Sequence, residues 1–145
     1  MSAKIIDGKL TSKKLRTGIS EKVAELRARG VTPGLAVVIV GDDPASRTYV
    51  NNKKKACAEC GIMSEEYALP AETTENELLE LLDTLNARPE INGILVQLPL
   101  PKHISEEKVI LKILPEKDVD AFHKQNVGAI MTGDYEFVPC TPAGV

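Results

Sequence analysis

The sequence Leu35-Ala-Val-Val-Ile-Val-Gly-Asp-Asp-Pro-Ala-Ser46 sets the architecture of this 145-residue chain. Its first six residues are apolar and mostly β-branched, which is typical of a strand covered on both faces. Its second half, from Gly41, is rich in turn-forming and acidic residues. A buried strand that runs into a polar turn predicts a parallel sheet, because the strands of parallel sheets are covered by helices on both sides.

A helix is predicted directly after this turn, over residues 44–60. Asp43 is a suitable N-cap, Pro44 a suitable first helical residue and Gly61 a suitable stop after the last turn. At about 100° per residue, one stripe of the helix is expected to face the core. The members of this stripe are Tyr49, Lys53, Ala56, Cys57 and Cys60.

Lys53 is the unusual member of that stripe, because a core-facing position favours an apolar residue. Burial lowers the pKa of an amine, so a lysine held there beside a tyrosine is a candidate catalytic group. The alternative is a lysine that buries its stem and keeps its ammonium in water. Lys54 and Lys55 are expected to point into solvent, so they are not candidates.

Strands and helices alternate along the rest of the chain. The predicted elements are a lead-in strand at 5–6, helices at 9–29, 74–86, 106–114 and 123–131, and strands at 62–69 and 93–97, followed by an irregular segment at 137–145. Thr74 and Glu77 have the spacing of a capping box. The alternation predicts an α/β fold with three α/β/α layers and a mostly parallel sheet, in which ligands bind beyond the carboxyl ends of the strands.

Composition excludes several classes of protein. An apolar fraction of 43% excludes a disordered chain, and a net charge of −3 with scattered lysines argues against nucleic acid as a partner. No apolar run is long enough to span a membrane and the N-terminus lacks a signal-peptide core, so a cytoplasmic protein is expected. Cys57 and Cys60 lie inside the predicted helix and are interpreted as core residues. Neither His103 nor His123 has a spacing from them that predicts a metal site.

Two segments with unusual polar content lie at the carboxyl ends of predicted strands, residues 41–46 before the Lys53 helix and residues 97–101. Gln97 closes an apolar strand and is followed by Pro99 and Pro101, which cannot continue a hydrogen-bonded ladder. Its amide is both donor and acceptor, and the alternative role is a bond to nearby backbone. The sequence Lys117-Asp-Val-Asp120 places two carboxylates in a loop before a helix. The alternative for this pair is helix capping.

Together these segments resemble the methylenetetrahydrofolate dehydrogenase/methenyltetrahydrofolate cyclohydrolase family. The match runs in order over nearly the whole chain, which makes it specific although no single segment would be. The matching segments are Val40-Gly-Asp-Asp-Pro-Ala-Ser46, Tyr49-Val-x-x-Lys53-x-Lys55-Ala56, Gly93-Ile-Leu-Val-Gln-Leu-Pro-Leu-Pro101, Pro115-Glu-Lys-Asp-Val-Asp120 and Pro139-Cys-Thr-Pro-x-Gly144.

The resemblance implies an enzyme of one-carbon metabolism with two activities and no metal. It oxidises 5,10-methylenetetrahydrofolate with NADP or NAD, and then hydrolyses the methenyl product to 10-formyltetrahydrofolate. The resemblance implies that Tyr49 stacks on the folate, Lys53 is the central catalytic group, Gln97 hydrogen-bonds that lysine and Asp120 holds the pterin. The remaining substrate contacts that it implies are Val50, Val96, Leu98 and Pro99.

Length and one substitution depart from the family pattern. Family members are roughly twice as long and carry an NAD(P)-binding Rossmann domain, so residues 1–145 are expected to be the folate-binding catalytic domain alone. No GxGxxG-type phosphate loop is present, so little dehydrogenase activity is expected from this chain. The family forms homodimers, largely through the other domain, so a monomeric state is compatible with this chain alone. Ala121 stands where the family usually has glycine, and a local backbone adjustment that keeps Asp120 in place is expected.

Two other classes of function are left open by the sequence. One is a folate-binding module that performs no chemistry. The other is a half-domain of an amino-acid or shikimate-type dehydrogenase, which shares this fold.

Overall fold

The computed structural model describes residues 5, 7–136 and 138–144. Its elements in chain order are α1 (Gly8–Ala28), β1 (Gly34–Val40), α2 (Pro44–Cys60), β2 (Met63–Leu69), α3 (Glu75–Ala87), β3 (Gly93–Val96), α4 (Glu106–Lys112), the 3₁₀ helix η1 (Pro115–Lys117), α5 (Lys124–Thr132) and α6 (Cys140–Gly144). The three main predicted strands and the five predicted helices are therefore confirmed to within two residues at each end, and the lead-in at 5–6 is not.

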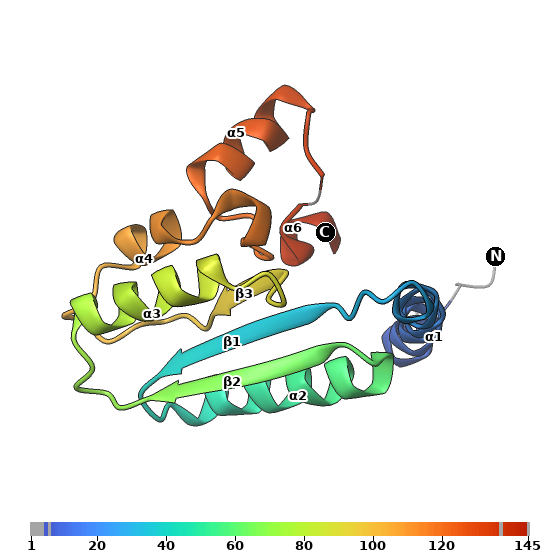
Figure 1. The fold of residues 1–145 in the computed structure, drawn as a ribbon, viewed down its shortest axis with the longest axis horizontal. Coiled ribbons are helices and arrows are strands. Elements are labelled where there is room, and N and C mark those ends of the chain that lie inside the picture. The colour runs from blue at the N-terminus through green and yellow to red at the C-terminus, as the bar shows by residue number, and fades with distance from the viewer. Residues whose placement is uncertain (1–4, 6, 137, 145) are drawn as a thin grey trace.

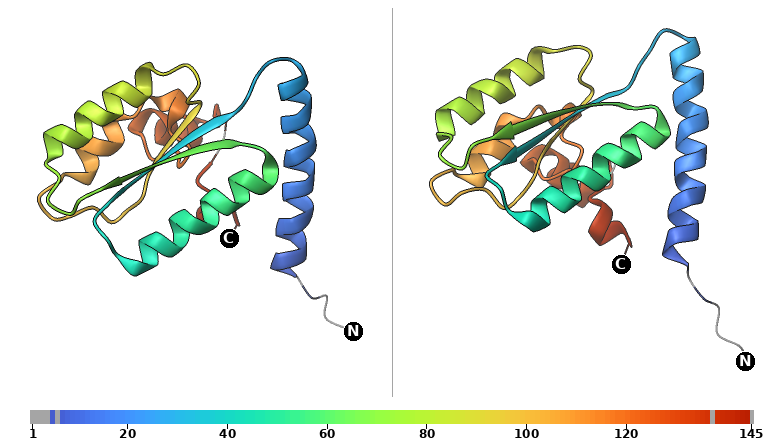
Figure 2. Two further views of the ribbon diagram at one scale, coloured as in Figure 1. Left: turned by 60° about the horizontal axis from the view of Figure 1, so that its bottom comes forward. Right: turned by 90° about the horizontal axis from the view of Figure 1, so that it is seen from below.

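The sheet is parallel, with strand order β2-β1-β3. Helices α3 and α4 cover one of its faces and α2 covers the other, which confirms the three-layer α/β/α prediction (Figure 1). Helix α1 stands at one end of the molecule, beside α2 (Figure 2). None of the helices that the structure describes is both long and apolar enough to cross a membrane.

Strand β1 forms the centre of the core because both of its faces are buried. Ala36, Val38 and Val40 pack with the apolar faces of α3 and α4. Val37 and Ile39 point the other way and pack with residues of α2 and β3. The period-2 alternation of a strand thus divides one apolar run between two helical layers. The carboxyl end of β1 leads through a short turn into the start of α2.

Helix α2 begins and ends as predicted, but its buried face is rotated from the expected stripe. The Ser46 amide donates to Asp43 Oδ2 at 2.7 Å, and Gly61 ends the helix with a left-handed φ of 77°. Tyr49 is 62% exposed, whereas its neighbour Val50 is fully buried. The buried line runs through Ser46, Val50, Cys57 and Cys60, and Lys53 lies on it between Val50 and Cys57.

The two ends of the chain differ from the predicted elements. The segment 137–145 was expected to be irregular, yet Cys140–Gly144 is a short helix, in which the Ala143 amide donates to the Pro139 carbonyl at 3.1 Å. Proline is tolerated in a first turn, where its missing N–H has no intrahelical partner. Ile5 is exposed and outside any strand, and Ile6 lies outside the described residues.

A charged cluster covers the edge strand β2. Both oxygens of Glu65 accept bonds from Arg88, at 2.7 and 2.8 Å, and the Tyr67 hydroxyl donates to Glu65 at 2.6 Å. These bonds lower the pKa of Glu65 from 4.5 to about 2, with the bond from Arg88 as the largest cause. A carboxylate held in this way also discourages the strand edge from pairing with another chain.

Glu65→Gln is expected to flatten the acid limb of the stability curve. A carboxyl whose pKa is depressed in the folded state contributes stability above its unfolded pKa and loses it as the pH falls toward its folded pKa. For Glu65 that window runs from about pH 4.5 down to about pH 2. Urea midpoints measured across this window should fall less for Glu65→Gln than for the parent chain. Equal falls would contradict the assignment, and so would an equal effect of Glu80→Gln, a substitution at an exposed residue of α3.

Candidate functional site

Helix α2 and strand β3 bring Lys53 and Gln97 together. The Lys53 Nζ donates to Gln97 Oε1 at 3.1 Å. Gln97 is the first residue after β3, and its backbone N–H donates to the Val38 carbonyl of β1 at 2.8 Å, so the sheet fixes its position. Its Nε2 donates to the Leu98 carbonyl at 2.7 Å. Both readings of Gln97 therefore hold, because the backbone bond orients the amide so that its oxygen faces the lysine.

Lys53 is half-buried, with its stem on the buried face of α2 and its ammonium at the carboxyl end of the sheet. Only one of the three donors of an ammonium is needed for the bond to Gln97. Tyr49 lies one helical turn earlier and is exposed, which makes its ring an accessible flat surface. Val50 was expected to contact the substrate, but its side chain is fully buried in the core with Val37, Ile39 and Leu95, so it supports the helix instead.

Asp120 reaches the same place from the loop after η1. Burial raises the pKa of the Asp120 carboxyl, the nearby charge of Lys53 opposes that shift and the charge of Asp118 adds to it. Within the described ranges, no donor contacts the Asp120 side-chain oxygens. Lys53, Gln97 and Asp120, predicted separately from three segments, thus form one polar group with a carboxylate available to a ligand.

Helix capping was the alternative considered for both aspartates, but the structure gives Asp118 a different structural role, as the acceptor for donors of its own loop and of α5. It is 3% exposed and accepts bonds from the backbone N–H of Asp120 at 3.3 Å, from that of His123 at 2.7 Å and from Asn126 Nδ2 at 3.1 Å. The N-cap of α5 is His123. Asp120 caps no helix, so the capping alternative does not apply to it.

Ala121 keeps a backbone conformation that suits glycine. Its φ is +55° and its methyl is fully buried. The loop accepts the strain of a left-handed alanine, so the adjustment expected at this position leaves the backbone in the left-handed region. Asp120 stays in the site, as expected.

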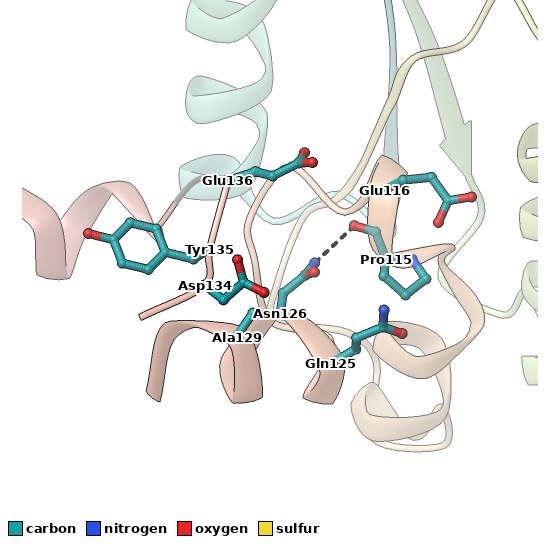
Figure 3. A pocket seen from close by; sticks show the side chains of 8 residues that line it. All are labelled: Pro115, Glu116, Gln125, Asn126, Ala129, Asp134, Tyr135 and Glu136. Carbon is teal, nitrogen blue, oxygen red and sulfur yellow. Dashed lines mark hydrogen bonds between the residues drawn. The ribbon is translucent and has the colours of Figure 1, made fainter. Parts of the chain in front are cut away.

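A small apolar hollow of about 10 Å³ adjoins Asp120, lined among others by Val96, Leu98 and Phe122. It is far smaller than a bicyclic ring, so a ligand of that kind would lie over it. Pro99 is exposed and does not line it. A roomier hollow of about 220 Å³ lies elsewhere, between η1, α5 and the loop after α5 (Figure 3). Its lining is acidic and amidic and contains none of the predicted site residues, so we place the site by its chemistry.

The residues at the start of α2 do not fit a nucleotide. A phosphate group binds where helical N–H groups are free at an N-terminus. Here Asp43 already accepts from the Ser46 amide at 2.7 Å, and Asp42 adds a second, exposed carboxylate. The buried thiols Cys57 and Cys60 are free, and burial raises the pKa of Cys57, as expected for inert core residues.

Sequence reasoning missed the contributions of Asn126 and His123. Neither lies in a recognisable motif with the two aspartates, and the only signal was their position in the first turn or so of the helix that follows. Their role depends on the path of the loop, which composition and periodicity do not specify.

Comparisons with known proteins agree with this geometry. The chain is 60% identical over 145 residues to the bifunctional protein FolD of Ruminiclostridium cellulolyticum, covering 100% of this chain and 51% of that protein. It is 61% identical over 143 residues to the bifunctional protein FolD of Geotalea daltonii, covering 99% of this chain and 51% of that protein. The chain therefore spans about half the length of the curated relatives it matches.

Solved structures of the same kind superpose closely. The bifunctional methylenetetrahydrofolate dehydrogenase/cyclohydrolase FolD of Campylobacter jejuni has a TM-score of 0.92 and 50% identity, over 95% of this chain and 49% of that one. The methylenetetrahydrofolate dehydrogenase-cyclohydrolase of Trypanosoma brucei, solved with NADP cofactor and an inhibitor, has a TM-score of 0.92 and 38% identity, over 99% and 50% of the two chains.

The family model described as the catalytic domain of tetrahydrofolate dehydrogenase/cyclohydrolase matches residues 6–120, a range that contains Tyr49, Lys53, Gln97 and Asp120. This match covers well over half of the chain and agrees with the relatives and the superposed structures. The chain belongs to the tetrahydrofolate dehydrogenase/cyclohydrolase family.

Proposed function

We propose that this chain is a folate-binding catalytic domain that hydrolyses 5,10-methenyltetrahydrofolate to 10-formyltetrahydrofolate, with Lys53 as the central catalytic group. The observation that carries the proposal is the 3.1 Å bond from Lys53 Nζ to Gln97 Oε1 at the carboxyl end of the sheet, with Asp120 alongside. A half-buried glutamine that holds a lysine at a ligand-binding edge has no evident packing purpose, since an apolar pair would pack better there.

The side chains around Lys53 suit the pterin and aminobenzoyl groups of a reduced folate. A pterin presents an exocyclic amine and ring N–H groups, and the unbonded carboxylate of Asp120 can accept both. The exposed ring of Tyr49 offers a flat surface to the pterin or to the aminobenzoyl group. Val96 and Leu98 border the same place through the small apolar hollow. Pro99 directly follows Leu98 and is proposed to shape the turn beside the ligand.

Lys53 is proposed to manage protons during the hydrolysis. Water adds to the electrophilic methenyl carbon, one carbon–nitrogen bond opens, and the net reaction of cation and water gives the formyl product and one proton. An amine positioned next to that carbon can accept a proton from the attacking water or donate one to the departing nitrogen. The bond to Gln97 fixes the Nζ while leaving its other positions free for this exchange.

The oxidation step is proposed for the whole protein, with NADP or NAD as the hydride acceptor. The T. brucei relative was solved with NADP. In the present chain the N-terminus of α2 is taken by Asp43 and does not fit a pyrophosphate. We therefore derive no hydride transfer from residues 1–145 and propose that further sequence supplies the Rossmann domain. Homodimer formation through that domain, a monomeric state for this chain and a cytoplasmic location belong to the same proposal.

The proposal predicts hydrolysis without oxidation. The 145-residue chain should speed the loss of methenyl absorbance above the buffer rate, and should reduce NADP or NAD in the presence of 5,10-methylenetetrahydrofolate at a negligible rate. Binding of 5-formyltetrahydrofolate without any hydrolysis would favour the folate-binding module instead. Oxidation at the rate of a complete enzyme would overturn the assignment of the cofactor to another domain.

Thermal-shift measurements with a folate, shikimate and amino acids distinguish a folate-binding domain from a half-domain of an amino-acid or shikimate-type dehydrogenase. A ligand that binds only the folded state raises the melting temperature in proportion to the logarithm of its concentration over its dissociation constant. 5-Formyltetrahydrofolate should raise it, while shikimate and free amino acids should leave it unchanged. The opposite pattern would point to the amino-acid or shikimate-type dehydrogenases.

A further inference from the structure

The loop that carries Asp120 is built around a buried carboxylate outside the proposed reacting group. Asp118 is 3% exposed and holds the Asp120 and His123 amides and the Asn126 side chain. No cation pairs with it within the described residues. A buried carboxylate is costly unless several donors satisfy it. Three donors converge here, one from Asp120 itself and two from residues that follow it, so the chain from 118 to 126 is wrapped around one side chain.

Asn126 ties this centre to the preceding 3₁₀ helix. Its Nδ2 donates to Asp118 Oδ2 at 3.1 Å and to the Pro115 carbonyl at 2.9 Å, the second bond being drawn in Figure 3. One amide group thus connects α5, η1 and the buried carboxylate. Both of its donors are used, so its orientation is fixed.

The sheet fixes the other side of the loop. Asp118 forms a parallel bridge with Ile94 of β3. At Gly93 an added Cβ would lie only 2.5 Å from Val119, so the loop packs directly on the strand backbone. Ala121 follows in a left-handed conformation that is held in spite of its cost. Only side chains of the loop with no role in this packing remain free to face a ligand, and Asp120 is one.

We propose that Asp118 and Asn126 are a positioning pair, which holds the Asp120 carboxylate where it receives the pterin of a reduced folate. This inference rests on the proposed function, because it assigns a purpose to the geometry around Asp120. Neither residue touches the ligand. Asp118 fixes the backbone on both sides of Asp120, and Asn126 fixes Asp118.

Asp118 also acts on Asp120 through its charge. The charge of Asp118 raises the pKa of the Asp120 carboxyl, in addition to the larger effect of burial. Lys53 acts in the opposite direction. The balance among these charges sets how readily Asp120 is ionised when a folate arrives. The pH dependence of folate affinity therefore reports the effect of Asp118, which a purely structural support would not change.

The first test compares Asn126→Ala with Asn86→Ala. Asn86 is a matched control: it also makes two hydrogen bonds, to the Lys112 carbonyl at 2.8 Å and from the Leu114 amide at 3.1 Å, on the segment that leads into η1. We expect Asn126→Ala to weaken binding of 5-formyltetrahydrofolate about tenfold, which is about 1.4 kcal/mol, and to raise KM for hydrolysis more than it lowers kcat. Asn86→Ala should keep its affinity within about twofold at a similar loss of Tm, since each variant loses two hydrogen bonds. Equal affinities for the two variants would overturn the proposal.

Two further measurements separate a failure of the inference from a failure of the proposed function. Hydrogen exchange of the Asp120 and Ala121 amides needs no ligand and should quicken in Asn126→Ala but not in Asn86→Ala. Unchanged exchange would overturn the pair even if folate binds, and absence of folate binding by the parent chain would instead overturn the proposed function. If Asp118→Asn folds, the loss of folate affinity at acid pH should begin at a lower pH in this variant than in the parent chain. An unchanged pH dependence would exclude the effect of the Asp118 charge.

Discussion

Lys53→Met is expected to reduce hydrolysis of 5,10-methenyltetrahydrofolate by at least about a hundredfold, the usual contribution of a positioned acid–base group. The substitution removes the Nζ that Gln97 holds at 3.1 Å and replaces it with an apolar side chain of similar length. The stem of residue 53 lies on the buried face of α2 between Val50 and Cys57, where methionine packs well. The melting temperature should therefore stay the same or rise.

Lys55→Met is the matched control for this prediction. Lys55 is on the same helix two residues later and is exposed, so its substitution makes the same chemical change outside the site. Both variants should be assayed by the loss of methenyl absorbance at one substrate concentration below saturation, with melting curves taken alongside. If Lys53→Met retains the parent rate, Lys53 is a lysine that merely buries its stem. If both variants lose activity equally, the loss reflects overall charge.

The ends of α2 could be predicted from sequence, but its rotation could not. Asp43, Pro44 and Gly61 act locally, through backbone groups within a turn of each residue, so their effect does not depend on the rest of the fold. Tyr49 and Val50 compete for one buried position in a helix with few other apolar residues. The fully buried choice is Val50, because the space between α2 and the sheet is filled by valine, isoleucine and leucine.

The site was predictable to the extent that its residues lie at ends of strands. Parallel strands deliver their carboxyl ends to one edge, which predicted that the segments around Gln97 and Lys53 converge. The hydrogen bond between the two residues was implied by the family resemblance, and the 3.1 Å bond agrees with it. The different roles of Asp118 and Asp120 were not predictable, since the two have the same chemistry and differ by two positions. What separates them is the path of the loop: Asp118 meets Asn126, eight residues later, whereas Asp120 faces the site.

Asp120→Asn is expected to weaken binding of 5-formyltetrahydrofolate by at least about tenfold while raising the stability of the free protein. An asparagine of the same shape offers one acceptor where the carboxylate offers several, and its amide hydrogens face the donors of the pterin. Burial raises the pKa of Asp120 above its ordinary value of 3.8, so the ionised form is unfavourable in the folded state. Removing that charge should raise the urea midpoint at neutral pH.

The pH dependence gives this prediction a sign that can be checked. Because the pKa of Asp120 is raised in the folded state, the ionised carboxyl destabilises the fold. This destabilisation develops as the pH rises from 3.8 through the folded-state pKa of Asp120. The stability of Asp120→Asn relative to the parent chain should therefore grow over that interval and become constant above it. The folate affinity of the parent chain should fall as the pH is lowered through the same interval, because protonation of Asp120 turns an acceptor into a donor. The weaker affinity of Asp120→Asn should not change over that interval. Asp42→Asn, whose side chain is 91% exposed, provides the control and should change neither curve. Unchanged affinity in Asp120→Asn would mean that the folate is held elsewhere and that the available carboxylate beside Lys53 has another use.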